Sequence, residues 1–165
     1  MDKYYYVVSQ LPLLFFGKKP DITIQYFLDE SKKWLSAKDY RILARTNIND
    51  IKSEIRRPDA LRMYQNFEHQ LREDIALWRQ AQKKDVEYKP TSFPLSIIKE
   101  GNPLEIEVKL MQLRWAFIDE LHREHHFDLG MLVLYHLKLQ ILQRYFTFNK
   151  EEGLKKFQKL YEVNI

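Results

Sequence analysis

The sequence predicts an all-α protein, a single helical bundle of about five to seven helices. Three observations support this fold. Two strongly periodic segments follow each other between residues 102 and 145, a narrow apolar stripe runs through residues 58–84, and the 165-residue chain has only 4 Gly and 6 Pro. An all-β protein needs more turn residues than that. We therefore expect one domain over residues 1–165, made of N-terminal helices (1–84), a linker packed on the core (85–101), and a C-terminal hairpin with a last helix (102–165).

The first part of the chain is apolar and aromatic from Tyr4 to Phe16. Its period does not distinguish helix from strand. Because helices follow, we favour a buried helix that ends or kinks at Pro12, before a turn at residues 17–20. Asp21 is the expected cap of a helix over residues 22–35. Its inward residues are expected to be Ile24, Phe27 and Leu28, with Trp34 as a further candidate.

A second capping arrangement follows at once. Ser36 and Asp39 resemble a capping box and open a short helix through Tyr40, Leu43 and Ala44. Residues 47–50 break this helix, and residues 51–57 are expected to form another short turn or helix.

The longest helix is expected to run from Pro58, a first-turn proline, to about Lys84. Charged residues, Glu68 and Arg72 among them, flank a narrow apolar stripe, as in a coiled-coil seam. The stripe therefore packs against another helix, in the same chain or in a partner. Its members recur at intervals of three and four: Ala60, Tyr64, Phe67, Leu71, Ile75 and Trp78.

An antiparallel helical hairpin follows the linker. Asn102 caps its first helix, Pro103 takes the first helical position, and Glu105 completes a capping box. The second helix opens at Asp128 and runs to Tyr145, and a join this short implies an antiparallel pair. A further capping box at residues 149–152 predicts a separate last helix, whose inward residues are Leu154, Phe157, Leu160 and Tyr161.

The first hairpin helix has two apolar faces when its residues are placed at about 100° intervals. A helix with two apolar faces is buried on two sides, so we expect it to be the central helix of the bundle. One face holds Leu104, Val108, Met111, Trp115 and Ile118, and the other holds Ile106, Leu110, Leu113, Phe117 and Leu121.

Charged residues at buried positions of this hairpin form the candidate site. Glu107 and Arg114 share the seam between the two apolar faces, two turns apart. Lys138 lies on the apolar side of the second helix, and Asp119 is a second carboxylate within its reach. The opposite side of that helix is polar and holds His136, Gln140, Gln143 and Arg144. We hypothesise a buried ionic cluster or partner contact that involves Lys138, Arg114, Glu107 and Arg144. The alternative is a lysine that extends to solvent at the bundle rim.

Sequence signals of chemistry are weak. His122 and His126 are four residues apart, as two zinc ligands on a helix can be, but no third ligand is indicated. We interpret these histidines as a helix end, where imidazole complements the dipole. Gly-rich phosphate loops, a nucleophile elbow and cysteines are absent from the sequence, so no catalytic residue, cofactor or metal is predicted. A helical metal-dependent enzyme using His122 and His126 is kept as an alternative.

The composition is that of an ordinary globular protein, with 45% hydrophobic, 14% aromatic and 30% charged residues. A net charge of +4 is a mild excess, and the arginines are interleaved with acidic residues, so a nucleic-acid-binding module is a further alternative only. The N-terminus lacks a signal-peptide pattern, and no segment reaches the roughly 18 apolar residues that a membrane span needs. We therefore expect a soluble, cytoplasmic protein.

Three blocks of sequence together resemble a known family. They are Tyr4-Tyr5-Tyr6-Val7-Val8-Ser9-Gln10-Leu11-Pro12, then Leu113-Arg114-Trp115 with Asp119-Glu120, then Phe127-Asp128-Leu129 leading to Tyr135-His136-Leu137-Lys138-Leu139-Gln140-Ile141-Leu142-Gln143-Arg144. The combination is similar to a small bacterial family of uncharacterised proteins encoded within V-type (A/V-type) ATPase operons. The resemblance implies a non-catalytic subunit or accessory factor of a rotary ATPase, peripheral to the membrane, with other components of the ATPase as its partners.

One form of that role is a counterpart of the helical stalk subunit designated C, which couples the central stalk of the ATPase to the membrane ring. That stalk subunit is considerably longer and is built from repeated helical modules, so this chain corresponds to only part of it. The family offers no established catalytic residues that could be assigned here.

Overall fold

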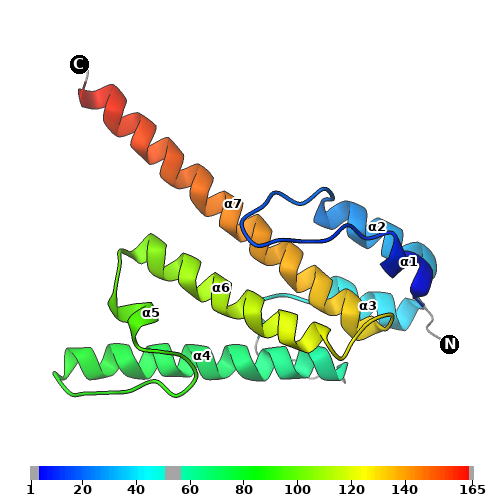
Figure 1. The fold of residues 1–165 in the computed structure, drawn as a ribbon, viewed down its shortest axis with the longest axis horizontal. Coiled ribbons are helices and arrows are strands. Elements are labelled where there is room, and N and C mark those ends of the chain that lie inside the picture. The colour runs from blue at the N-terminus through cyan, green and yellow to red at the C-terminus, as the bar shows by residue number, and fades with distance from the viewer. Residues whose placement is uncertain (1–3, 51–56, 164–165) are drawn as a thin grey trace.

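The computed structural model describes residues 4–50 and 57–163, with side chains described up to residue 148. Across these residues it forms seven helices and no strand, which confirms the all-α bundle (Figure 1). Helices α4, α6 and α7 pack against one another, α2 and α3 pack against α7 as well, and α1 lies beside α2. They are α1 (Tyr5–Ser9), α2 (Ile24–Trp34), α3 (Ala37–Arg45), α4 (Asp59–Lys83), α5 (Ser96–Lys99), α6 (Pro103–His122) and α7 (Leu129–Val163).

Capping side chains set the starts of three helices where the sequence predicts them. The Ser36 hydroxyl accepts a hydrogen bond from the Asp39 amide at 3.2 Å, and the Asn102 side chain accepts one from the Glu105 amide at 2.9 Å. Asp128 accepts the Met131 amide at 2.9 Å in the same way. These bonds satisfy amide groups that the first turn of a helix leaves without partners.

The predicted cap of α2 is wrong. Thr23, and not Asp21, has the extended backbone of a cap, and its hydroxyl accepts the Tyr26 amide at 3.1 Å. A hydroxyl one residue before the helix can reach the amide at N3, whereas Asp21 lies two residues farther out. The inward position of Trp34 is wrong too. Trp34 is 50% exposed and stacks on Tyr6, and the next residue, Leu35, is buried in its place.

The N-terminal segment is helical and not a strand, as the favoured prediction has it, but the helix is short and only partly buried, because Tyr5 and Tyr6 are exposed. Helix α1 ends at Ser9, before Pro12, and buries Val7 in the core. Gly17 then turns the chain with a φ of 80°, a conformation that glycine adopts without strain.

The central helix is α7, which corrects the expectation that α6 is central. Helix α7 packs against α2, α3, α4 and α6, and every residue from Leu132 to Leu139 is buried. Helix α6 is buried on two sides, as predicted, but its neighbours are α4, α5 and α7. The physical reason is that the N-terminal helices cover the side of α7 that α6 leaves open, and a helix surrounded on all sides must be apolar almost all round.

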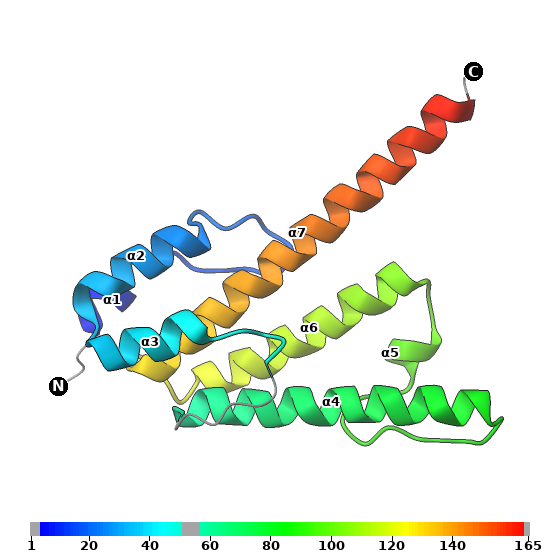
Figure 2. The same ribbon diagram turned by 180° about the vertical axis from the view of Figure 1, so that it is seen from behind.

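Helix α7 is also the longest helix, with 35 residues against 25 for α4. The predicted break at residues 149–152 is absent, and the second hairpin helix continues without interruption to Val163. Capping residues permit a helix start but do not prevent a helix interior, and the single Gly153 costs only about 1 kcal/mol there. In both ribbon views residues 149–163 extend away from the other helices (Figures 1 and 2).

The apolar stripe of α4 is filled from within the chain. Tyr64 packs in the main core with residues of α6 and α7. Leu71 packs in a smaller core with Phe93, Ile98 and Leu110, so the linker lies against the bundle as predicted. The expected turn or helix at residues 51–57 lies outside the described residues except for Arg57, and the side chains of the predicted last helix lie outside them as well.

Candidate functional site

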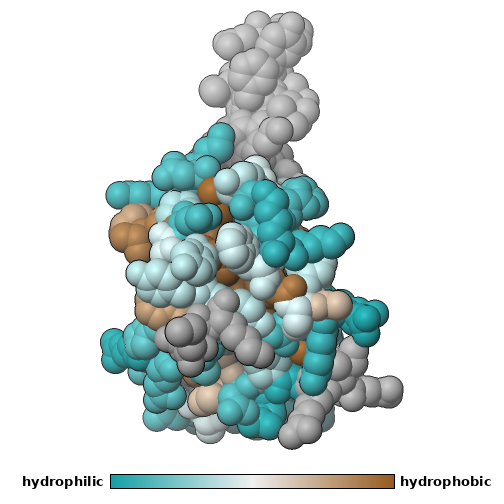
Figure 3. Space-filling model, turned by 90° about the vertical axis from the view of Figure 1, so that its right-hand side faces the viewer, coloured by the Kyte–Doolittle hydropathy of each residue, from teal (hydrophilic) through white to brown (hydrophobic). Residues whose placement is uncertain are grey.

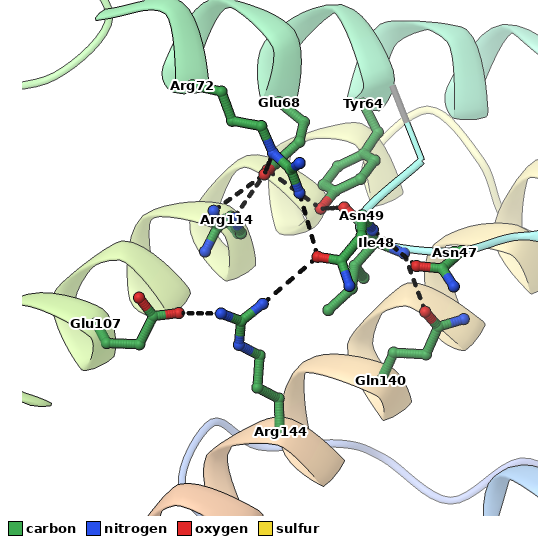
Figure 4. A network of polar contacts seen from close by, with 10 residues as sticks. All are labelled: Asn47, Ile48, Asn49, Tyr64, Glu68, Arg72, Glu107, Arg114, Gln140 and Arg144. Atoms are coloured by element: carbon green, nitrogen blue, oxygen red, sulfur yellow. Dashed lines mark hydrogen bonds and ion pairs between the residues drawn. The ribbon is translucent and has the colours of Figure 1, made fainter. Parts of the chain in front are cut away.

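A buried carboxylate at the centre of the bundle organises the candidate site. The Glu68 side chain on α4 is fully buried. Its two oxygens accept hydrogen bonds from Nε and Nη2 of Arg114 on α6, at 2.7 and 3.0 Å. Arg72, one turn along α4, donates to the same carboxylate at 2.8 Å, and the Tyr64 hydroxyl lies 3.4 Å away (Figure 4). Glu68 is therefore satisfied by two guanidinium groups.

Both members of the Glu68–Arg114 pair are charged. Burial alone would raise the pKa of Glu68, but the hydrogen bonds and charges of Arg114 and then Arg72 hold that pKa below its usual value. Burial likewise opposes the charge on Arg114, and Glu68 more than offsets it, so the pKa of Arg114 is raised. The pair thus remains ionised in the interior.

Arg144 on α7 forms the outer end of the same network. Its Nη2 lies 2.7 Å from Oε1 of Glu107 on α6, and its Nη1 lies 3.4 Å from the side-chain oxygen of Asn49. Asn49 also accepts a hydrogen bond from Arg72 at 3.1 Å (Figure 4). The side-chain oxygen of Asn49 therefore connects the segment that ends at residue 50 to both α4 and α7.

Three of the four predicted site residues belong to this network, and Lys138 lies apart from it. Arg114 is paired with Glu68, and Arg144 with Glu107. Lys138 forms an ion pair with Asp119, and its ammonium lies 4.9 Å from the ring centre of Trp115. Only 10% of the Lys138 side chain is exposed, so it is held within the chain between α6 and α7.

The polar side of α7 forms one wall of a pocket of about 590 Å³. The pocket lies between α2, residues 44–49 and α7, and its polar wall holds His136, Gln140, Gln143 and Arg144. Gln140 binds the neighbouring backbone twice, because its oxygen accepts the Ile48 amide at 3.0 Å and its nitrogen donates to the Thr46 carbonyl at 2.7 Å. The predicted polar side of this helix is thereby confirmed.

His136 is the most buried group in this wall. Its Nδ1 lies 3.0 Å from the Leu43 carbonyl oxygen, which can only accept, so Nδ1 carries the proton. Burial lowers the pKa of His136 to about 4, and the imidazole is therefore neutral at pH 7. Its other nitrogen, Nε2, has no partner among the side chains and backbone that the structure describes.

Glu68 and Asn49 belong to the site but are not among the residues predicted from the sequence. Glu68 is predicted among the charges that flank the stripe, although it lies four residues after Tyr64 and three before Leu71, which puts it inside the stripe. That spacing is the signal that could have found it. Asn49 has no such signal, because its partners come from α4 and α7, far away in sequence.

A second buried carboxylate holds the linker against α4. Asp74 accepts hydrogen bonds from the Tyr88 hydroxyl at 2.9 Å, from the Ser92 amide at 2.9 Å, and from the Ser92 hydroxyl. Burial alone would raise the pKa of Asp74, but these bonds outweigh it and the pKa is lowered. Asp74 therefore has a structural role, and it too is not among the residues predicted from the sequence.

The histidines considered as metal ligands do not share a helical face. His122 is the last residue of α6, and His126 is exposed in the turn that follows. Burial, followed by the charge of Lys138, lowers the pKa of His122 to about 4. Within the described residues, no three histidine, aspartate or glutamate side chains are grouped so that they could hold a metal ion.

Two of the arginines that are interleaved with acidic residues, and that were considered for nucleic acid, are paired with carboxylates. Arg62 is paired with Asp59, and Arg72 with Glu68.

The comparisons with known proteins concern the C-terminal part of the chain. Residues 91–163, which include α5, α6 and α7, match the model of a family described as a protein of unknown function (DUF2764). No curated protein and no solved structure matches the chain. Among the described residues, no helix combines the length and the apolar character required to cross a bilayer. The family model thus covers Glu107, Arg114 and the α7 residues of the candidate site, whereas Glu68, Arg72 and Asn49 lie outside the matched residues.

Proposed function

We propose that this protein is a non-catalytic protein-interaction subunit or accessory factor of a bacterial V-type ATPase, located in the cytoplasm and peripheral to the membrane. A role in the central stalk, as a counterpart of part of the helical stalk subunit, is one form of this proposal. The observation that supports the proposal is the projecting end of α7, beside which neither ribbon view places another of the described helices (Figures 1 and 2).

A lone helical segment of this length is only marginally stable in water. Isolated helices shorter than about 12 to 15 residues are marginal, and helices within proteins gain most of their stability from tertiary packing. Residues 149–163 have that length, and their sequence carries Leu154, Phe157 and Tyr161 at intervals of three and four. Such spacing is typical of a helix that packs against a partner.

The body of the protein is suited to hold this helix in a fixed direction. The first half of α7 is surrounded by four helices, and Arg144 ties it to α6 and to Asn49 immediately before the projecting part begins. A helix that is anchored rigidly at its root loses little conformational freedom when it binds, which favours affinity.

The choice of the ATPase as partner rests on the three blocks of sequence that resemble the family encoded in its operons. The second and third of these blocks lie next to each other in the structure, because they belong to the two helices of the α6–α7 hairpin. Arg144 is the predicted contact residue that offers most surface, with 34% of its side chain exposed, whereas Arg114 and Lys138 are almost fully buried.

The test is recovery of the ATPase with the tagged full-length chain from cells that contain both. We expect the wild-type chain and a control, Lys156→Ser with Lys159→Ser, to recover the ATPase equally. Leu154→Ser with Phe157→Ser is expected to lose it, because this variant removes apolar residues that the helical period places on one stripe. Failure of the wild-type chain to recover any component of the ATPase contradicts the proposal, and equal recovery by both double variants removes the role given to the projecting helix.

A further inference from the structure

A hollow at the junction of α2 and α3 is bordered by three cations. It has a volume of about 520 Å³, and Lys32, Arg41 and Arg45 lie in its wall. Arg41 and Arg45 are four residues apart on α3 and so lie on one face of that helix. The Lys32 ammonium comes from α2 and lies 5.7 Å from the centre of the Tyr40 ring. Positive charge from two helices therefore converges on one hollow.

No carboxylate of the described part of the chain neutralises these cations. All three side chains are exposed, none forms an ion pair with a described residue, and none of the described residues that line the hollow is acidic. The charge is uncompensated because the carboxylates of α2 and α3 are bonded elsewhere. Asp29 accepts a hydrogen bond from Gln25 at 2.9 Å, Glu30 pairs with Lys33 at 2.8 Å, and Asp39 accepts the Tyr4 hydroxyl.

The position of these cations along their helices explains only part of the pattern. Lys32 and Arg45 lie in the last turns of α2 and α3, where a cation complements the helix dipole. That effect does not require both to border one hollow. It also does not account for Arg41, because two like charges four residues apart destabilise a helix. A local arrangement that is unfavourable and has no compensating contact is typical of functional sites.

The rest of the wall is small, apolar or aromatic. It consists of Leu35, Tyr40 and the short side chains of Ala37 and Ala44. The volume of about 520 Å³ lies within the range of about 300 to 1,000 Å³ that is usual for small-ligand sites. Figure 3 shows the side of the molecule on which the N-terminal helices lie, where hydrophobic residues reach the surface in small separate areas among hydrophilic ones. This end of the molecule is therefore better suited to a small charged ligand than to a broad apolar partner.

We propose that the hollow between α2 and α3 binds an organic phosphate, with the phosphoryl group held by Lys32, Arg41 and Arg45 and the organic group against Tyr40. A phosphate monoester carries a charge of about −1.5 to −2 at pH 7 and three acceptor oxygens, which match three cations better than the single charge of a carboxylate does. Guanidinium groups bind such oxygens through two parallel hydrogen bonds. The same chemistry is found in soluble organic phosphates and in phospholipid headgroups. This inference goes beyond the proposed function and does not depend on the ATPase.

The test uses phenyl phosphate, whose ring can lie against Tyr40, and benzoate as its carboxylate match. Each is titrated into the full-length protein, and binding is followed by NMR at the Nε–H signals of Arg41 and Arg45. We expect phenyl phosphate to shift both signals, and benzoate to bind about tenfold more weakly, the usual scale for loss of a hydrogen bond to a charged group. A second arm measures sedimentation of the protein with phosphatidylcholine vesicles, with and without phosphatidic acid. Binding in this arm alone, lost when both arginines are replaced, supports the inference with a lipid headgroup as the source.

Three variants distinguish a built site from a generally basic surface. Arg41→Gln with Arg45→Gln is expected to raise the Kd for phenyl phosphate about tenfold or more. Lys33→Gln with Lys38→Gln removes the same charge from the same two helices outside the hollow, and should leave the Kd within about twofold. Ala37→Leu keeps all three cations but occupies space in the hollow, and is expected to raise the Kd about tenfold. Circular dichroism confirms that each variant is folded.

Weaker binding by the arginine variant and by Ala37→Leu, but not by the lysine variant, supports the inference. Equal weakening by the lysine variant would mean a general attraction of anions to a basic surface, and would overturn it. Benzoate that binds as tightly as phenyl phosphate would assign the hollow to carboxylates, including acidic protein segments, and overturn it as well. Absence of binding to both phenyl phosphate and the phosphatidic acid vesicles has the same consequence. The proposed function is tested separately, by recovery of the ATPase.

Discussion

Arg114 on α6 binds Glu68 on α4 through two hydrogen bonds, with Nε and Nη2 at 2.7 and 3.0 Å from the two carboxylate oxygens. The two residues are 46 positions apart in sequence, and both are buried. A two-point pair of this kind fixes the rotation of both helices about their axes, because a small rotation of either breaks both bonds. It therefore sets the register of α4 against the α6–α7 hairpin.

Removal of one partner from this pair should be costly. Glu68→Gln leaves the buried guanidinium of Arg114 without its carboxylate, and we expect it to lower the free energy of unfolding by about 3 to 5 kcal/mol. Urea denaturation followed by circular dichroism measures this loss. The control is Glu73→Gln, an exposed position on the same helix, which should change stability by less than about 1 kcal/mol.

The double variant Glu68→Gln with Arg114→Met should be more stable than Glu68→Gln alone, because no uncompensated charge then remains in the interior. If the double variant instead loses the sum of the two single losses, the two residues are not coupled and the assignment of the pair as the organising contact is wrong.

Asp74 should control the attachment of the linker rather than the stability of the whole bundle. Asp74→Asn removes a carboxylate that accepts bonds from Tyr88 and Ser92, at a cost of about 1 to 3 kcal/mol. We expect faster amide hydrogen exchange over residues 85–95, with unchanged exchange at the centres of α6 and α7. Asp59→Asn, at an exposed position of α4, is the control and should leave the linker unchanged. Uniform acceleration in all helices would contradict a local role.

Stability should fall in mild acid because of His136. Its folded-state pKa of about 4 lies below the value near 6.5 of an unfolded histidine, so the unfolded chain binds the proton first as the pH falls. Above about pH 7, His136 is neutral in both the folded and the unfolded chain and does not affect the free energy of unfolding. That free energy falls progressively between about pH 6.5 and pH 4. For this residue alone, the loss between pH 7.5 and 5.5 is about 1 kcal/mol.

His136→Asn provides the comparison, since an asparagine amide can replace the Nδ1–H that faces the Leu43 carbonyl. Urea denaturation at the two pH values should show a smaller loss in this variant than in the wild type. An identical loss in both would mean that His136 is not protonated on unfolding in this range.

Lys138→Met should alter the surroundings of Lys138 more than the stability of the fold. Met fits among the apolar neighbours, and Asp119, whose side chain is half exposed, returns to solvent, so we expect a change within about 1 kcal/mol. The charge of Lys138 lowers the pKa of His122, and its removal should therefore raise that pKa in an NMR titration. If stability, the His122 pKa and ATPase recovery are all unchanged, a role for Lys138 in an ionic cluster or a partner contact is excluded.

The features that could be predicted from the sequence depend on local chemistry. The starts of α3, α6 and α7 follow from Ser36, Asn102 and Asp128, because a capping side chain bonds an amide only three residues away. The two apolar faces of α6 and the stripe of α4 follow from helical period. These features can be predicted without knowing which helix packs against which.

The features that could not be predicted depend on distant neighbours. Arg114 and Glu107 lie on one seam of α6, yet their partners, Glu68 and Arg144, come from two other helices. Helix α7 is central because α2 and α3 cover it, and the sequence of α7 alone does not indicate which helices pack against it. The uninterrupted run of α7 past Asn149 shows that a capping pattern indicates where a helix can begin and does not require a break.

Association with the ATPase is tested most directly by the composition of the intact, active V-type ATPase from the same organism, purified through one of its catalytic subunits. Quantitative mass spectrometry gives the amount of this chain relative to the purified enzyme. We predict that the chain is present in a fixed ratio and is lost when Leu154 and Phe157 are changed to serine. Reproducible absence of the wild-type chain from the active complex would contradict the proposed function.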